Sequence, residues 1–294
     1  KSADGPWPDD TVSYTYNTAA LRSALSLAQP SGTWTNGLFY DAARGLTNVV
    51  SAAGTFSNIF SATRKLEVER LYLPASLAIT NNYDSMARRN ETWFYGPGFY
   101  HTNGFNVAGQ RTTTATSMSL GSQNVVSFGY DSMGQLISAA GTEGGSPARF
   151  HQQLGYGYDA AGNLTTRTNH NLMQTFTPNV LNQLSNVVRS GTLTLSGGAV
   201  TSGILVDGST NGVGVYVSDW TFAKGTNTIT GSNQTFTVVA QDGYGRSVTN
   251  SVTVTLHSTV SYTYDSNGNL TSDGSRSFTY GDENQLTKVE VTNS

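Results

Sequence analysis

The chain has 294 residues, of which 12% are charged, and its net charge is −3 with a pI near 5.8. Charged residues are about half as frequent as the roughly 25% usual in soluble domains. No basic cluster provides the electrostatic footprint of a nucleic-acid partner, so that class of partner is excluded. Cysteine is absent, which excludes disulfides and thiolate metal sites.

Strand and turn residues dominate the composition. The chain has 32 glycines, 15 tyrosines and 12 phenylalanines among many Ser, Thr and Asn residues, a mixture that favours β-strands and tight turns. No apolar run approaches the about 20 residues of a membrane span, so we expect none. The chain begins at Lys1 without Met or a signal peptide and stops after the strand-like QLTKVEVTNS, so we expect a fragment of a longer protein.

The first elements in chain order are degenerate copies of one pattern, in which an aromatic residue precedes Asp or Asn. The copies are SYTYNTAAL (13–21), LFYDAARGL (38–46) and NNYDSMARR (81–89). Arg44 precedes the glycine of the second copy, and Ala87 replaces the glycine of the third. We expect each copy to form a β-hairpin, like the stronger copies further along the chain.

Between the second and third copies lies ATRKLEVERLYL (62–73), the segment most similar to a helix. Its charged residues are spaced to pair along a helical surface. However, apolar residues alternate over 66–73 and Pro74 follows, so a strand is favoured.

Aromatic residues gather in ETWFYGPGFYHTNGF (91–105), where the Gly96-Pro97-Gly98 tripeptide predicts a hairpin with a protruding loop. Aromatic rings can stack on sugar rings, so the candidates for a carbohydrate contact are Trp93, Phe94, Tyr95, Phe99 and Tyr100. The alternative, which we favour, is that rings at a period of two pack against neighbouring hairpins.

The pattern becomes regular in FGYDSMGQL (128–136), YGYDAAGNL (156–164) and YTYDSNGNL (262–270). The Tyr-Asp-x-x-Gly-x-Leu spacing is identical in these copies, and its residues are Tyr130, Asp131, Gly134, Leu136, Tyr158, Asp159, Gly162, Leu164, Tyr264, Asp265, Gly268 and Leu270. Two further units, TFTPNVLNQLSNV (175–187) and SFTYGDENQLTKV (277–289), keep the frame without this Asp. A catalytic loop used once would not recur so often.

Each copy has the chemistry of a β-hairpin. In SYTYD, Tyr262 and Tyr264 are two residues apart and lie on one face of a strand. The aspartate can accept a backbone N–H at the start of the turn, and the glycine tolerates positive φ at its end. We therefore expect Asp131, Asp159 and Asp265 each to begin a tight turn between antiparallel strands.

A lone hairpin is marginally stable in water, so these units must stack side by side and bury a shared aromatic face. The predicted fold is all-β, an array of antiparallel hairpins that forms a curled sheet.

These copies, together with NLTSDGSRSFTYGDENQLTKV (269–289), resemble the RHS-repeat or YD-repeat family of bacterial RHS proteins, ABC-toxin shell subunits and teneurins. The resemblance implies a strip of hairpins that spirals into a shell, which in toxin members encloses a C-terminal effector. It also implies that the partners are further repeats and a C-terminal segment of the protein's own longer chain. The Asp-Pro motif at which RHS proteins cleave themselves is absent, so neither autoproteolysis nor toxicity is carried over.

The Tyr-Asp pattern stops between Val187 and Thr259. Short alternating strands with turn signals every about 8–12 residues indicate a β-sandwich there, similar to bacterial Ig-like modules. We therefore expect hairpin repeats over 1–187, an inserted Ig-like β-sandwich over 188–258 and resumed repeats over 259–294. A sheet insertion within a shell is the alternative.

The ends of this insert should lie close together, because the same repeat continues on both sides of it. Alternation within its later strands predicts that four apolar side chains are buried: Phe236, Val238, Val252 and Val254.

No motif has the spacing of a metal or catalytic site. Asp265, Asn267 and Asn269 alternate like calcium ligands, but the later glutamate is missing and Gly268 falls where a turn needs it. The four histidines show no HxxxH or HExxH spacing, and no Gly-x-Ser-x-Gly motif occurs. We predict no metal, no cofactor and no catalytic activity.

The function expected from the sequence is therefore structural. The chain would be a non-catalytic segment of a secreted or surface-displayed bacterial protein, acting by encapsulation or contact outside the cell. The alternative is a carbohydrate-binding surface module with cell-surface glycans as partners. A third hypothesis is a hydrolase with an unrecognised site, which would need a cleft with two carboxylates or a Ser–His contact.

Overall fold

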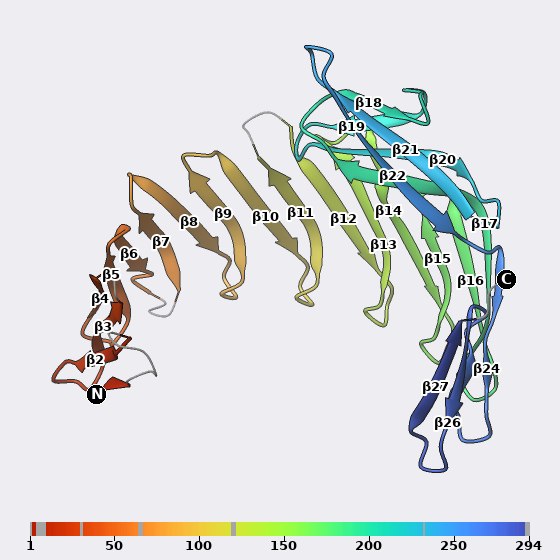
Figure 1. Cartoon of the computed structure of the whole chain (residues 1–294). Coiled ribbons are helices and arrows are strands. Elements are labelled where there is room, and N and C mark those ends of the chain that lie inside the picture. The colour runs from red at the N-terminus through yellow and green to blue at the C-terminus, as the bar shows by residue number, and fades with distance from the viewer. Residues whose placement is uncertain are drawn as a thin grey trace. The chain divides into compact units, whose positions relative to one another are not determined.

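The computed structural model in Figure 1 describes residues 2–3, 10–29, 32–63, 67–118, 122–231 and 233–291. Every regular element in these ranges is a β-strand, and the strands pair antiparallel, so the predicted all-β fold is confirmed. Those ranges contain no helix long and apolar enough to cross a membrane. The chain divides into two compact units, residues 1–104 with 115–120 and residues 105–114 with 121–294.

In the first unit, each strand pairs with the next along the chain. The strands are β1 (Ser2–Ala3), β2 (Val12–Tyr16), β3 (Arg22–Gln29), β4 (Gly32–Tyr40), β5 (Leu46–Ser51), β6 (Gly54–Phe60), β7 (Val68–Leu73), β8 (Leu77–Tyr83), β9 (Arg89–Tyr95) and β10 (Phe99–Phe105). The described part of the ambiguous 62–73 segment thus contains a strand, β7, while its residues 64–66 lie outside the described ranges.

The second unit continues the same neighbour-to-neighbour pairing. Its repeat strands before the insert are β12 (Asn124–Tyr130), β13 (Leu136–Glu143), β14 (Ala148–Tyr158), β15 (Leu164–Asn169), β16 (Leu172–Pro178) and β17 (Leu184–Gly198). After the insert come β23 (Thr259–Ser261), β24 (Thr263–Tyr264), β25 (Leu270–Ser272), β26 (Arg276–Tyr280) and β27 (Leu286–Val291). The remaining strand, β11 (Arg111–Ser117), has residues in both units.

A bulge follows the turn in each regular hairpin. Tyr130 is opposite Leu136, while Gly129 is opposite Ser138, so Ile137 has no partner across the strand pair. The same shift occurs before Tyr158 and Tyr264. A bulge leaves backbone groups outside the regular ladder, and those groups need another hydrogen-bond partner.

The strands of the insert belong to two sheets, one of which is joined to the main sheet through β17. They are β18 (Gly203–Val206), β19 (Val213–Tyr216), β20 (Thr221–Thr228), β21 (Asn233–Gln241) and β22 (Ser247–Thr255). The end of β17 pairs with β20, which also pairs with β19, while β18, β21 and β22 form the second sheet. Ile204, Val206 and Phe222 form the core between them.

The insert joins the repeats without a linker. β17 pairs with β16 from Leu184 to Gly191, with β23 up to Val188, and with β20 from Thr192 onward. The strand is therefore continuous across residue 187. The chain returns beside the point where it left, because Val188 is opposite Thr259. The backbone N–H of Arg189 donates to the Ser258 carbonyl at 2.7 Å.

Burial in the insert differs from the prediction at one strand. Phe236, on the central strand β21, is buried, and Val238 and Val254 are half-buried. Val252 is 43% exposed, so its predicted burial is wrong. The reason is that β22 is the edge strand of its sheet, and Val252 lines an open cavity of about 430 Å³ rather than the core.

Candidate functional site

The repeated motif forms a three-residue loop of one geometry. The Asp131 N–H donates to the Gln135 carbonyl at 3.0 Å, and the Gly134 N–H donates to the Asp131 carbonyl at 3.1 Å. The Asp131 Oδ1 accepts the N–H groups of Met133 and Gln135 at 2.9 and 2.8 Å. Gly134 has φ 85°, the left-handed conformation that ends this turn type.

Asp159 and Asp265 begin turns of the same kind. Their Oδ1 atoms accept backbone N–H groups two and four residues on, at 2.8–3.0 Å. In each, Oδ2 accepts the side-chain amide of the residue four positions on, at 2.9 Å. These amides lower the pKa of both carboxyl groups, and the backbone N–H groups lower it further.

The degenerate copies keep the turn without its glycine. The left-handed position is occupied by Ala20, Arg44 and Ala87, with φ of 60°, 67° and 65°. A side chain in this conformation costs about 1 kcal/mol. The side chains of Asn17, Asp41 and Asp84, which begin these turns, still accept the backbone N–H of the residue four positions on.

Sequence reasoning missed two of these turns. Asn106 begins one in FNVAGQ, and Asp242 begins another inside the insert, in QDGYGR. Each has a glycine three residues later with φ 81°. The signal was present as Asn or Asp followed by glycine at this spacing, but no tyrosine precedes either residue.

The tyrosine before the turn bonds to the preceding hairpin. The Tyr158 hydroxyl donates to the Leu136 carbonyl at 3.0 Å, and the Tyr130 hydroxyl donates to the Arg111 carbonyl at 2.8 Å. Each acceptor is the first residue of the preceding return strand, and Leu136 lies next to the bulge. Equivalent bonds join Tyr40 to Arg22, Tyr83 to Val68 and Tyr264 to Leu184.

Successive turns of the second unit also contact each other through side-chain amides. If the Asp, Asn or Gly that begins a turn is counted as its first residue, the amide belongs to the fifth residue of one turn and bonds to the fourth residue of the next turn. Gln110 Nε2 donates to the Gly134 carbonyl at 3.1 Å, and Asn163 Nδ2 donates to Asn182 Oδ1 at 3.2 Å. Asn269 Nδ2 donates to Asn284 Oδ1 at 2.8 Å.

Two further side-chain amides, those of Gln135 and Gln183, approach the next turn in the same way. The Nε2 atoms of Gln135 and Gln183 lie 3.5 and 3.3 Å from where a Cβ would stand on Gly162 and Gly268. The step from Gln183 to Gly268 crosses the insert in sequence, so the repeat continues in space as if the insert were absent.

The candidate sugar-contact aromatics lie on two faces. Trp93 stacks on Tyr95 with ring centroids 5.9 Å apart and meets Tyr100 at 4.5 Å. Phe94 and Phe99 are opposite each other in the β9–β10 pair, one residue out of phase, and so lie on the other face. The five residues therefore form a group of three and a separate pair.

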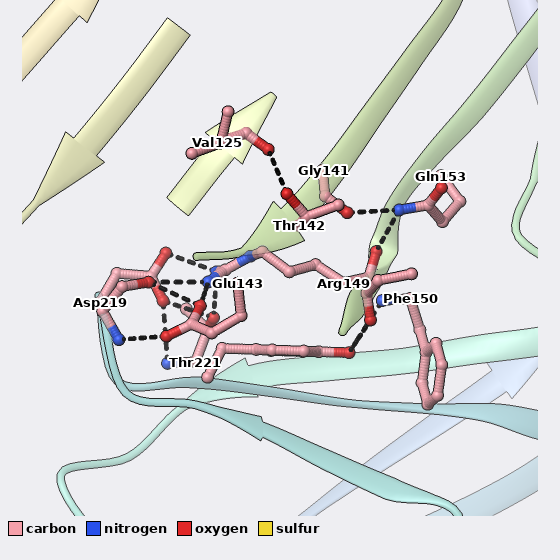
Figure 2. A network of polar contacts seen from close by, with 12 residues as sticks. Val125, Gly141, Thr142, Glu143, Arg149, Phe150, Gln153, Asp219 and Thr221 are labelled. Atoms are coloured by element: carbon pink, nitrogen blue, oxygen red, sulfur yellow. Dashed lines mark hydrogen bonds and ion pairs between the residues drawn. The ribbon is translucent and has the colours of Figure 1, made fainter. Parts of the chain in front are cut away.

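A buried arginine, which the sequence analysis did not single out, connects the repeats to the insert (Figure 2). Arg149 is fully buried at the start of β14. Its guanidinium bonds to Glu143 and Asp219, each at 2.6 Å, and to Thr221 at 2.6 Å. It also lies 4.6 Å from the centre of the Tyr216 ring.

Ser218 completes this network. Its N–H and hydroxyl donate to the Glu143 carboxylate at 2.7 and 2.8 Å, and its hydroxyl accepts from Arg149 at 3.0 Å. The Tyr216 hydroxyl accepts the Phe150 N–H at 2.8 Å. No sequence signal joins residues about 70 positions apart, which is why pattern analysis could not find them.

In this network the carboxylates of Glu143 and Asp219 are both paired with the Arg149 guanidinium. Burial alone would raise the pKa of Asp219, but hydrogen bonds from Arg149 and Thr221 outweigh it and lower the pKa. Burial and the nearby Arg149 charge lower the pKa of His151. Glu143 and Asp219 are two nearby carboxylates, yet both are bonded to one arginine, and Ser218 is bonded to Glu143 and Arg149 rather than to a histidine.

No group of three or more His, Asp or Glu side chains in the described ranges is placed to hold a metal ion. The calcium-like trio illustrates the reason. Asp265 directs both carboxylate oxygens at its own turn, where the Asn269 amide occupies Oδ2. Asn267 Nδ2 and Asn269 Nδ2 both donate to Asn284 Oδ1, so these two amides bond to the neighbouring turn.

Comparison with known proteins gives structural neighbours only. No family model matches the chain, and no curated protein matches it. The crystal structure of TcdB2-TccC3 aligns over 97% of this chain and 18% of its own, with 12% identity and a TM-score of 0.37. The crystal structure of TcdB2-TccC3-Cdc42 aligns over 97% and 17%, with 11% identity and a TM-score of 0.36. The chain therefore spans less than a fifth of these neighbours.

Proposed function

We propose that this chain is a non-catalytic structural segment of an RHS-repeat or YD-repeat protein, where it forms part of an encapsulating β-shell or contact surface. The proposal rests on the hydrogen bonds that the repeated Asp and Tyr side chains make. In each strong copy the aspartate bonds to its own turn, and the tyrosine hydroxyl bonds to the preceding hairpin. The motif therefore serves to form and join the hairpins and not to catalyse a reaction.

The partners and location follow from the same proposal. The chain would pack against further repeats and a C-terminal segment of its own longer polypeptide. The protein would be secreted or displayed on a bacterial surface.

Purified protein tests the non-catalytic part. Panels of glycosidase, esterase and protease substrates should show no turnover above buffer. The hydrolase hypothesis predicts turnover that disappears in Glu143→Gln or Asp219→Asn, with the circular dichroism spectrum unchanged. That result would replace the structural proposal with an enzymatic one.

A second function, carbohydrate binding, is favoured by one observation on the first unit. Trp93, Tyr95 and Tyr100 share a face of the sheet, and Tyr95 is 50% exposed. A polar cavity of about 640 Å³, lined in part by Arg70 and Tyr72, lies in the same unit. Ligand sites combine aromatic side chains with a small number of polar groups.

A glycan array tests this second function. Tyr95→Ala should abolish any binding, whereas Trp34→Ala, which removes another exposed aromatic ring, should leave it intact. Binding that survives Tyr95→Ala, or no binding at all, rejects the carbohydrate function.

A further inference from the structure

The outer strand of the second sheet of the insert, β22, has an edge that no described strand covers. Its residues, Ser247–Thr255, pair with β21 along their whole length on one side. No described strand pairs with the other side, and every residue of β22 except Val254 is exposed. An edge of this kind presents unpaired N–H and C=O groups to any strand that can pair with it.

Other edge strands of the second unit differ from β22. In the insert, β18 and β19 have only four residues each and contain buried residues. In the repeats, β27 carries Lys288 and Glu290. Short length and charged residues are common devices that prevent a sheet edge from pairing. The range 247–255 is longer and contains neither a charged residue nor proline, so neither device protects this edge.

The inner face of β22 is apolar and incompletely covered. Its even-numbered residues lie on the side of the core, because Val252 is directly opposite the buried Phe236 of β21. Val248 and Val252 are nevertheless 75% and 43% exposed. Both line the open cavity of about 430 Å³, and none of the residues that line this cavity is charged.

The outer face of β22 carries hydroxyl groups, since each of its odd-numbered residues is Ser or Thr. Two of them already pair across the β21–β22 ladder. The hydroxyls of Thr253 and Thr235 are 2.7 Å apart, and those of Ser251 and Thr237 are 3.2 Å apart. Such pairs stabilise neighbouring strands.

The pattern of the two faces is kept when the strand is reversed. If two copies of β22 pair antiparallel about Ser251, Val248 is opposite Val254 of the second copy, and Asn250 is opposite Val252. On the outer face every Ser or Thr is opposite another Ser or Thr. The pairing of β22 with its own copy therefore continues, on both faces, the pattern that already joins β22 to β21.

We infer that the free edge of β22 is an interface between two copies of this chain, in which the two β22 strands pair antiparallel about a two-fold axis at Ser251. Each copy covers Val248 and Val252 of the other, and the second sheets of the two inserts join into one. A charged strand fits this edge less well, because a charge beside the uncharged cavity would lose its water without gaining a partner. Self-complementary contacts of this kind are the commonest in homo-oligomers. The inference does not depend on the proposed function, since β22 belongs to the insert and not to the repeats.

Cysteine cross-linking tests the register, because the chain has no cysteine of its own. Directly opposite residues of an antiparallel pair have Cα atoms about 4.5–5.5 Å apart, a separation that a disulfide can span. Ser251→Cys should therefore give a covalent dimer when the whole chain is oxidised by dissolved oxygen. Thr249→Cys is the matched control. Its two copies would lie four positions apart, about 13 Å along the strands, and should not cross-link.

Sedimentation velocity tests association without a new cysteine. With rising concentration the unaltered chain, of 31.2 kDa, should form a species of twice that mass. Amide hydrogen exchange over residues 247–255 should then slow at least about tenfold. Val252→Lys places a charge in the interface and should keep the chain monomeric. Val200→Lys, which alters an exposed valine of the insert outside β22, should still allow the dimer to form.

Three results would overturn the inference. The first is a monomer at every concentration with no covalent Ser251→Cys dimer. The second is equal cross-linking of Ser251→Cys and Thr249→Cys, because the two copies would then have no fixed register. The third is a dimer that survives Val252→Lys, because the copies would then meet at another surface. If the circular dichroism spectrum shows that Val252→Lys does not fold, the two cysteine variants decide.

Discussion

The tyrosine that precedes each turn makes a contact that phenylalanine cannot make. Its ring lies on a strand face, which either residue would allow, but its hydroxyl reaches a carbonyl of the preceding hairpin, which at Leu136 and Leu184 lies beside the bulge. The bulge creates the need for a donor, and the tyrosine meets it. At β6 the residue before the turn is Phe60, and there Asn58 donates to the Leu46 carbonyl at 2.8 Å instead.

Removal of one such hydroxyl should have a measurable cost. Tyr264→Phe should lower the free energy of unfolding by about 0.5–1.5 kcal/mol, the usual net value of a hydrogen bond. Tyr264→Ala should cost on the order of 3 kcal/mol, because the packed ring is lost as well. Urea unfolding measures both. Tyr280→Phe is the matched control, since Tyr280 makes no such bond within the described residues, and an equal loss there would contradict the assignment.

The turn aspartates should make stability depend on acid pH. Because the folded pKa values of Asp159 and Asp265 are lowered, their contribution is fully present above the unfolded pKa of about 3.9. It is lost as the pH falls below that value through the folded pKa. Asp265→Asn should keep the turn, as Asn17 and Asn106 do, and should flatten the loss of stability below about pH 4. Urea unfolding from pH 3 to 7 should show this difference, and parallel curves would refute it.

Glycine and alanine should have opposite effects at equivalent turn positions. Gly134→Ala should destabilise the protein by about 1 kcal/mol, because its φ is 85° and the new Cβ would lie 3.1 Å from Gln110 Nε2. Ala87→Gly should stabilise by a similar amount, because it relieves a left-handed alanine. Thermal unfolding of the pair, with opposite signs expected, is the measurement. A shift of the same sign in both would show that φ does not control these turns.

At the scale of elements, one arginine makes the charged contacts between β14 and the insert. Arg149 bonds to two carboxylates and two hydroxyls: Glu143 is six residues before it, and the other three groups lie about 70 residues after it, in residues 218–221. Such a buried network adds little stability as a whole, but it penalises any arrangement in which one partner is missing. It therefore specifies how the insert sits on the hairpin β13–β14.

Arg149→Met should destabilise the protein by about 3–5 kcal/mol, since Glu143 would remain buried without its cation. Chemical denaturation measures the loss. Arg246→Met is the control: its side chain is 79% exposed in an ion pair with Asp242, so the change should cost below about 1 kcal/mol. Similar losses in both variants would mean that burial of Arg149 contributes nothing special.

At the scale of the whole molecule, local rules predict the hairpins and fail where distant segments meet. The strand–turn–strand pattern of residues 128–136 could be predicted because period-two alternation and turn chemistry act within ten residues. The exposure of Val252 could not, because it depends on which strand of a sheet lies at the edge. The Arg149 network needs the insert to fold back onto β14, and no local pattern encodes that contact.

The insert itself provides the last prediction. Arg189 and Ser258 are hydrogen-bonded across antiparallel strands, so residues 190–257 can be replaced by a two-residue Asn-Gly turn. The shortened chain should stay soluble with a β-type circular dichroism spectrum, since β17 still pairs with β23 through Val188. It should nevertheless be less stable, because the deletion removes Asp219 and Ser218 from Arg149. Replacing Arg149 by Met and Glu143 by Leu in the shortened chain should recover stability, as apolar residues often replace a buried ion pair at no cost. Loss of the β-type spectrum in both shortened chains would show that the sandwich is part of the main sheet's folding unit.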